Sequence, residues 1–144
     1  MRLRAGVVPL VILVLALAPA LILPTPLAAG SRPTRPRFDL RASPRSAISP
    51  VYVLVVAELK GGDDLEEFYC PGLEWNWGDG TRSLYEADCP PFEPGTSIER
   101  RFSARHAFRE AGEFDVQVRL RRADRSVATA TVHVSVQGQF ASLE

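Results

Sequence analysis

Apolar and polar residues alternate strictly in two stretches near the end of the chain. Phe114 to Arg121 carries apolar side chains at even positions and polar ones at odd positions, and Ala128 to Val136 repeats this pattern. Because successive side chains of a β-strand point to opposite faces, each stretch predicts a strand with one buried and one solvated face. The polar residues from Arg121 to Ser126 predict a turn, so the two strands should form a hairpin.

Shorter apolar segments predict further strands earlier in the chain. Tyr52 to Leu59 is almost continuously apolar and rich in β-branched residues, which indicates a strand in the middle of a sheet. Phe38, Leu40 and Ala42 mark a possible first strand, and Ser97 to Phe102 marks a weaker one. Outside the apolar stretch at its start, the chain shows no convincing helical period. Several short strands at regular spacing predict an all-β, antiparallel β-sandwich.

A strand and a tight turn follow one another in the middle of the chain. Leu73, Trp75 and Trp77 occupy alternate positions, so the two tryptophans should point to the same face of a strand. The next residues, Gly78-Asp79-Gly80, predict a tight turn in which the glycines take positive φ and the Asp79 side chain bonds neighbouring amides.

The first 29 residues have the layout of a signal peptide. Arg2 and Arg4 precede an apolar run from Ala5 to Leu23, and small residues end the segment. We expect this segment to be a signal-peptide helix that is cleaved after Ala29. The alternative is an uncleaved membrane anchor. Either outcome places the rest of the chain outside the cytoplasm, as a secreted, periplasmic or cell-surface protein. The expected organisation is a signal peptide (1–29), a Pro/Arg-rich linker (30–37), one β-sandwich domain (38–137) and a tail (138–144).

The distribution of charge excludes one class of partner. The chain has 17 basic and 17 acidic side chains, and without Arg2 and Arg4 it keeps 15 basic ones. A domain without a basic excess is not expected to bind nucleic acid. Ten acidic residues lie between Glu58 and Glu93, and eight arginines lie between Pro94 and Arg125. This segregation predicts either two charged surfaces that complement each other within one domain, or a molecule with an acidic side and a basic side.

Cys70 and Cys89 are the two cysteines of the chain. In an oxidising compartment, an even pair close in sequence predicts a disulfide. Closing a loop of this length would contribute about 3 kcal/mol to stability in the chain-entropy model. A structural zinc site is not expected, because it needs four ligands and the histidines are only His106 and His133.

Two separated motifs resemble a known family. The first is Trp75-Asn76-Trp77-Gly78-Asp79-Gly80, and the second is His106-Ala107-Phe108, Gly112 and Phe114-Asp115-Val116. Together they resemble the polycystic kidney disease (PKD) domain, with its aromatic-x-aromatic-Gly-Asp-Gly turn, its His-x-Tyr and its Gly-x-Tyr-x-Val strand. The resemblance covers residues 38–136 and implies an immunoglobulin-like β-sandwich that serves extracellular proteins as a spacer, adhesion or ligand-binding module. The departures are Trp77 in place of Phe, Phe108 and Phe114 in place of tyrosines, and the cysteine pair with segment 85–96.

Three candidate sites compete with structural roles. Trp75 and Trp77 could stack on a sugar, but we expect Trp75 in the core and leave partial exposure of Trp77 open. Asp79 could bind calcium together with the acidic loop, although turn capping is the favoured role. That loop consists of Asp63, Asp64, Glu66 and Glu67. His106 or His133 could form a hydrolytic triad with Ser103 or Asp79, yet no nucleophile elbow surrounds any serine.

These observations predict an exported module without catalytic activity. The sequence holds no phosphate-binding glycine loop, zincin motif or glycosylation sequon, so neither an enzyme nor a cofactor is expected. The expected partners are an extracellular protein or a polysaccharide, bound through the loops around the glycine turn and the cysteine pair. The alternative is an accessory or inhibitory protein that acts on an extracellular enzyme through the disulfide-braced segment 70–96.

Overall fold

The computed structural model describes residues 30–139 of the chain. The chain divides into two units, Met1–Ser31 and Arg32–Glu144. The predicted signal peptide 1–29 and the last part of the predicted tail, 140–144, lie outside the described residues. Within 30–139, no helix is long and apolar enough to cross a membrane. The elements are β1 (Arg37–Ser43), β2 (Ser46–Ile48), β3 (Val51–Lys60), the 3-10 helix η1 (Glu66–Phe68), β4 (Gly72–Asn76), β5 (Arg82–Tyr85), β6 (Arg101–Phe108), β7 (Gly112–Arg122) and β8 (Arg125–Gln137).

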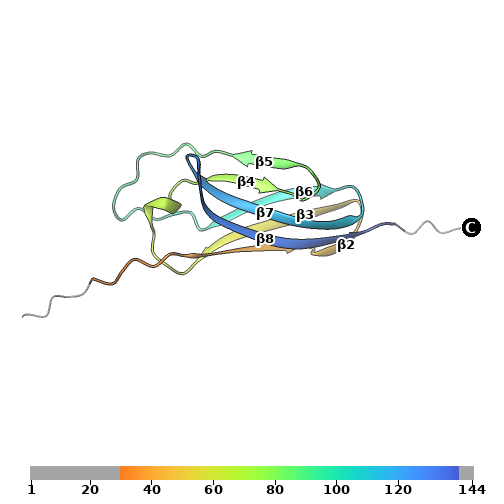
Figure 1. Cartoon of the computed structure of the whole chain (residues 1–144), viewed down its shortest axis with the longest axis horizontal. Coiled ribbons are helices and arrows are strands. Elements are labelled where there is room, and N and C mark those ends of the chain that lie inside the picture. Colours follow the sequence, from red (N-terminus) through yellow and green to blue (C-terminus); the bar gives the residue numbers. More distant parts are fainter. Residues whose placement is uncertain (1–29, 140–144) are drawn as a thin grey trace, which may run out of the picture. The chain divides into compact units, whose positions relative to one another are not determined.

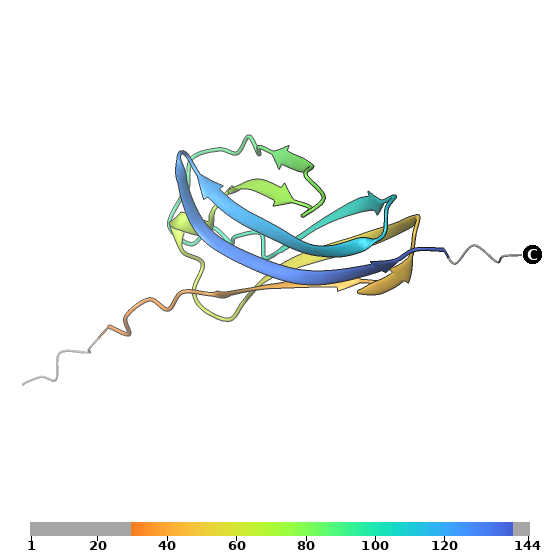
Figure 2. The same ribbon diagram turned by 45° about the vertical axis from the view of Figure 1, so that its right-hand side comes forward.

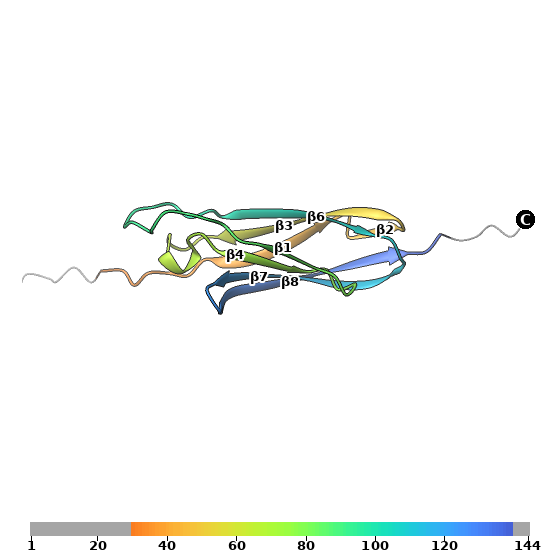
Figure 3. The ribbon, with the colours of Figure 1, turned by 90° about the horizontal axis from the view of Figure 1, so that it is seen from above.

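Two sheets pack face to face in the second unit, as Figure 1 and Figure 3 show from two sides. The smaller sheet has the strand order β1-β3-β6, and the larger has the order β2-β8-β7-β4-β5. This arrangement confirms the predicted β-sandwich. One pairing departs from the predicted antiparallel pattern, because β2 runs parallel to β8. The reason is that the chain crosses from the smaller sheet to the larger one between β1 and β2.

Strand β3 occupies the middle of the smaller sheet, as its apolar sequence predicted. Only one of its faces is buried. Val53, Val55 and Ala57 are fully inaccessible to solvent, whereas the intervening Tyr52 and Leu54 are 71% and 40% exposed. The continuous apolar run therefore supplies buried side chains to the core from one face and leaves apolar side chains on the outer face.

Strands β7 and β8 form the predicted hairpin, and the two long strands curve together across the larger sheet (Figure 2). Their pairing runs from Gly112↔Val136 to Arg122↔Arg125. The loop is thus tighter than the six-residue turn that the polar sequence suggested. The side chains of Val116, Val118 and Leu120 are fully buried, which confirms the inward face of this strand.

The sequence prediction failed for the two strands on one side of the sandwich. The weak strand expected at Ser97–Phe102 is wrong for most of its length, because β6 starts at Arg101 and continues to Phe108. The inward positions of β6 include Ala104 and His106, which carry a weak apolar signal. Strand β5 was not predicted at all, since all four of its residues are exposed and show no alternation between core and solvent.

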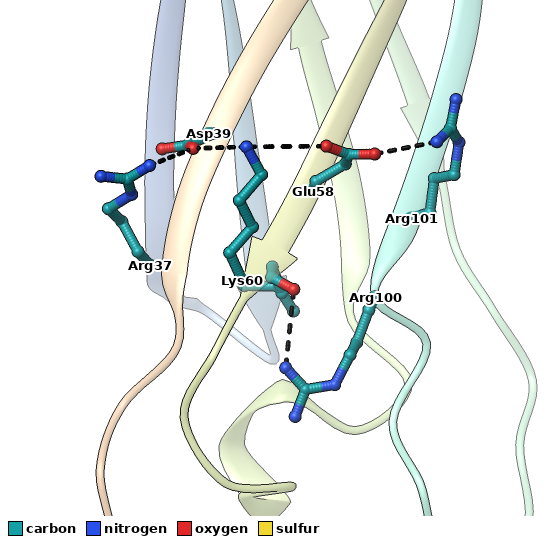
Figure 4. Close-up of polar contacts among 7 residues, drawn as sticks. Arg37, Asp39, Glu58, Lys60, Arg100 and Arg101 are labelled. Atoms are coloured by element: carbon teal, nitrogen blue, oxygen red, sulfur yellow. Dashed lines mark hydrogen bonds and ion pairs between the residues drawn. The ribbon is translucent and has the colours of Figure 1, made fainter.

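An ion-pair chain crosses the outer face of the smaller sheet and joins its three strands (Figure 4). Asp39 contacts Arg37 at 2.7 Å and Lys60 at 3.0 Å, and the hydrogen bonds from Lys60 and Arg37 lower the pKa of Asp39. Glu58 lies 3.8 Å from Lys60 and 2.8 Å from Arg101. Arg101 belongs to the basic segment and Glu58 to the acidic one, so here the two charged segments complement each other within one domain.

Candidate functional site

Five rings of the two sequence motifs form one column, in the order Trp75, Trp77, His106, Phe108 and Phe114. Successive ring centroids lie 5.7, 4.4, 4.8 and 4.6 Å apart. Both indoles are buried, with 3% and 1% of their surface exposed. Neither indole can stack on a sugar, so the carbohydrate-stacking hypothesis and the partial exposure of Trp77 are both wrong. Trp77 also donates its ring N–H to the Ser83 hydroxyl at 2.9 Å, a bond that Phe could not make.

Asp79 ties the turn after β4 to strand β6 of the opposite sheet. Its Oδ1 accepts hydrogen bonds from the amide and the hydroxyl of Thr81, at 3.0 and 2.6 Å. Its Oδ2 lies 2.6 Å from Nε2 of His106. Partial burial opposes ionisation of the carboxyl, but the hydrogen bonds from Thr81 and His106 outweigh it, so the pKa of Asp79 is lowered. Asp79 therefore caps its own turn and links the two sheets.

His133 lies on the polar face of β8, as its alternating sequence predicted. Its Nδ1 lies 2.8 Å from Asp115 and its Nε2 lies 2.7 Å from Glu113. Hydrogen bonds that His133 donates to the carboxylates of Asp115 and Glu113 raise the pKa of His133. Ser135 donates to Glu113 rather than to the imidazole. In the described part of the chain neither histidine hydrogen-bonds a serine, and Ser103 contacts neither of them, so the residues considered for a triad are not assembled.

Each carboxylate of the acidic loop contacts a group of the chain itself. Asp63 accepts hydrogen bonds from the amide and hydroxyl of Thr34, Asp64 lies 2.6 Å from Arg100, Glu66 lies 2.9 Å from Arg122, and Glu67 lies 3.1 Å from Arg35. The loop lies before β4 and Asp79 lies after it, so the strand separates them. Residues 30–139 contain no cluster of three or more acidic, His or Cys side chains that could hold a metal ion. Within the predicted linker 30–37, Thr34 and Arg35 thus contact the acidic loop.

The disulfide Cys70–Cys89 is present and braces the long connection between β5 and β6. Residues 86–100 form no strand, but their middle part is held to the segment before β4. The Tyr69 hydroxyl donates to the Pro90 carbonyl at 3.0 Å, and the Tyr69 ring packs edge-on against Phe92 at 5.3 Å. The connection is therefore held to the sandwich by the disulfide and the Tyr69 ring in its first part, and by the buried Ile98 and the Arg100 hydrogen bonds at its end.

A groove of about 400 Å³ runs between β5 and β6, on the side of the sandwich where each sheet ends. We call it the β5–β6 groove. Its lining comprises Leu73 and Trp75 of β4, Ser83–Tyr85 of β5, Glu99, and Arg101–Ala104 of β6. Tyr85, which points inward and is 58% exposed, is its most accessible apolar side chain, whereas Leu84, 69% exposed, points to the outer face on the side of Glu74. The braced connection follows directly after Tyr85.

A second hollow, of about 510 Å³, lies around the turn between β6 and β7. Asp79, His106 and Phe114, which line it, already serve the turn and the aromatic column, and the exposed Arg109 and Glu110 also line it. The β5–β6 groove differs, because its most accessible side chain, Tyr85, belongs to neither of these structural features. Sequence reasoning missed this groove, and the only signal for it was the apolar pair Leu84-Tyr85 within an acidic, polar stretch.

Comparison with known proteins finds matches among solved structures. The sequence matches no protein-family model and no curated protein. Among solved structures, the PKD domain of an M14-like peptidase from Thermoplasmatales archaeon SCGC AB-540-F20 superposes with a TM-score of 0.52 at 13% identity, over 74% of this chain and 99% of that one. A CARDB domain from Pyrococcus furiosus matches with a TM-score of 0.44 at 10% identity, over 73% and 96%. The chain therefore has a PKD-like fold, an immunoglobulin-like β-sandwich.

Proposed function

We propose that this chain is a non-catalytic, exported module that binds another protein through the β5–β6 groove. The observation that carries the proposal is the exposure of Tyr85, which points inward from the edge strand β5 into an open groove and is still 58% exposed. Large apolar side chains that line a concave surface are typical of protein interaction sites. The disulfide and the Tyr69 contacts hold the adjoining connection in place, which reduces the entropy that binding would cost.

Three features support the exported and non-catalytic parts of the proposal. The leader 1–29 has the composition of a signal peptide. The disulfide Cys70–Cys89 is the kind of bond that persists in oxidising compartments. The histidines His106 and His133 are each engaged by carboxylates of the chain, and within residues 30–139 neither one hydrogen-bonds a serine, threonine or cysteine side chain. The fold likeness agrees with this proposal, although fold alone does not assign a function.

A protein partner is favoured over a polysaccharide by the position of the indoles. Planar rings that are open to solvent are the usual platform for a sugar, and both indoles lie in the core column. The accessible groups of the groove are instead one aromatic and two charged side chains. This set, Tyr85, Glu99 and Arg101, resembles the apolar centre and polar rim of a protein interface.

A second candidate function concerns the braced connection itself. The packing of Phe92 against Tyr69 gives residues 90–96 a fixed anchor, which is what an inhibitory or accessory loop for an extracellular enzyme would need. This candidate uses the tip of the connection, whereas the main proposal uses the groove beside it. Phe92→Ala should weaken the binding of such an enzyme, while Leu84→Ala should leave it unchanged.

Two exposed tyrosines provide a matched test of the main proposal. A photo-crosslinking amino acid is placed at Tyr85, in the groove, or at Tyr52, on the outer face of β3, in the full chain within the producing cell. We expect a discrete protein adduct from position 85 and none from position 52. The adduct protein is then purified, and its dissociation constant should rise at least tenfold with Tyr85→Ser and stay unchanged with Tyr52→Ser. An adduct from position 52 alone, or from neither position, contradicts the proposal.

A further inference from the structure

The free edge of β6 presents backbone groups that no other strand uses. The amide of Leu59 donates to the carbonyl of Arg100 at 2.8 Å, and the antiparallel register then continues in steps of two residues. Backbone groups of Phe102, Ala104, His106 and Phe108 therefore face β3. Those of Arg101, Ser103, Arg105 and Ala107 face away from it. Within residues 30–139 these four make no backbone hydrogen bond to any other segment.

The larger sheet extends beyond the smaller one on this side. Tyr85 is paired with Leu73 across β4 and β5, so both point toward the interior. Leu73 is 8% exposed, but Tyr85 is 58% exposed. The difference arises because the smaller sheet ends at β6 and leaves no strand opposite β5. One additional strand beside β6 would cover the inner side of β5 and close the groove.

The segment that follows β5 in the chain does not fill this position. Residues 86–100 form no strand, and the disulfide and Tyr69 hold them at the segment before β4. At the other end of β6, the pair Asp79 and His106 connects the two sheets. The unoccupied edge begins at Arg101, where the connection ends, and reaches Ala107 next to the Asp79–His106 pair, which is long enough for a strand of ordinary length.

The side chains along this edge define what an added strand should carry. On the inner side, the groove offers the exposed ring of Tyr85 and the half-buried Ala104, beside the buried Trp75 and Phe102. On the outer side, Arg101 is paired with Glu58, whereas Arg105 is exposed and forms no ion pair within the described part of the chain. An added strand should therefore place apolar side chains inward and an acidic side chain outward, beside Arg105.

The same charges disfavour a second copy of this chain as the added strand. Antiparallel pairing of two β6 strands centred on Ser103 would place Arg101 of each copy opposite Arg105 of the other. Like charges directly opposite each other destabilise a strand pair, and edge cations are a known protection against such pairing. The occupant that fits the edge is a segment of a different protein.

We propose that the free edge of β6 accepts an extended segment of a partner protein, with alternating apolar and acidic side chains, as an added strand. This inference rests on the proposed function, since it specifies how the β5–β6 groove holds its partner. Main-chain hydrogen bonds to Arg101, Ser103, Arg105 and Ala107 supply the register, and the apolar side chains of the segment contact the groove.

The test uses synthetic heptapeptides that alternate valine and glutamate, titrated into the isotope-labelled domain. We expect changes in the amide resonances of Arg101, Ser103, Arg105 and Ala107, and slower hydrogen exchange at these four amides. One peptide is N-methylated at every glutamate and another at every valine. In an added strand, only alternate residues direct their amides toward β6. One of the two methylation patterns should therefore weaken binding at least tenfold, and the other should have little effect. Glutamate methylation is the damaging pattern for an antiparallel guest.

Charge reversal provides the second arm. Arg105→Glu should weaken binding of the valine–glutamate peptide at least tenfold and strengthen binding of a valine–lysine peptide. The exposed Arg105 has no ion pair within the described residues, so the variant should fold. The proposal is overturned if the peptide does not bind at millimolar concentration, if both methylation patterns act alike, or if the free chain forms a dimer with these amides protected. A partner crosslinked at Tyr85 together with indifferent methylation would refute the added strand and leave the proposed function standing.

Discussion

His106 and Asp79 stand 27 residues apart in the sequence, yet their Nε2 and Oδ2 atoms lie 2.6 Å apart in the fold. The imidazole is also stacked on Trp77 at 4.4 Å, so one side chain serves both the aromatic column and the link between the sheets. The glycine turn and the His motif are therefore two halves of one structural joint. Binding has to be sought elsewhere, and the groove beside this joint offers the exposed apolar surface.

We expect energetic coupling between Asp79 and His106, the two residues of this contact. Asp79→Ala and His106→Phe, alone and together, form a double-mutant cycle in which the second change keeps an aromatic ring in the column. We expect a coupling energy of about 1–2 kcal/mol at pH 7, because the hydrogen bond involves an ionised carboxylate. Urea unfolding measures it. Strictly additive effects of the two substitutions would refute the link.

The lowered pKa of Asp79 sets the pH range of this contribution. A carboxyl with a folded pKa below its unfolded value stabilises the protein above that unfolded value, near 3.8, and stops doing so as the pH falls through the folded pKa. The destabilisation by Asp79→Ala should thus shrink as the pH falls through the acid range below the unfolded value, which urea unfolding at several pH values measures.

The two glycines of the turn should respond differently to alanine. Gly78 has φ +79°, and a Cβ there would lie 2.9 Å from the Asp115 carbonyl oxygen, whereas Gly80 has φ +89° and open space around it. Gly80→Ala bears only the left-handed backbone cost, of about 1–2 kcal/mol. Gly78→Ala adds a clash with backbone and should cost about 3 kcal/mol or more. Chemical denaturation compares the two, and equal losses would contradict this packing.

His133, on the outer face of β8, gives the folding stability a pH dependence of opposite sign to that from Asp79. Its pKa is raised above 6.5 by Asp115 and Glu113, so its protonated form stabilises the fold below pH 6.5. This contribution is lost as the pH rises through the raised value. The stability difference between the wild type and His133→Asn should therefore shrink from pH 6 to pH 9. A difference that is constant over this range would show that the carboxylates do not act on the imidazole.

Calcium should leave the stability of the protein unchanged. The loop carboxylates Asp63, Asp64, Glu66 and Glu67 are each engaged by a group of the chain, so a cation would have to displace those contacts first. Thermal melting with and without millimolar calcium checks this expectation. A rise in the melting temperature that EDTA reverses would contradict it, and Asp64→Asn would then show whether the loop is responsible.

Parts of the fold with a strong local signal could be predicted from the sequence. The hairpin of β7 and β8 has strict alternation, and the glycine turn has its own residue signature, so both were predicted at the correct place. Strand β6 was misplaced because His106 and Ala104 point inward with little apolar character. Strand β5 has no buried side chain that could produce an alternating pattern.

The site depends on relationships that a single sequence does not express. The segregation of acidic and basic residues was visible, but the partners within it, such as Glu58 with Arg101, depend on the register of β3 and β6. The open edge arises because residues 86–100 leave the position beside β6 unfilled. An absent strand has no signature in the sequence, so the groove could be seen only in three dimensions.

The most direct test of the central claim is amide hydrogen exchange of the full chain, free and in complex with the protein crosslinked at position 85. Our account predicts that protection on binding is confined to β5 and β6, and that it is largest at Arg101, Ser103 and Arg105. Protection on the outer face of β3 around Tyr52, or around the turn at Gly78, with β6 unchanged, would contradict it.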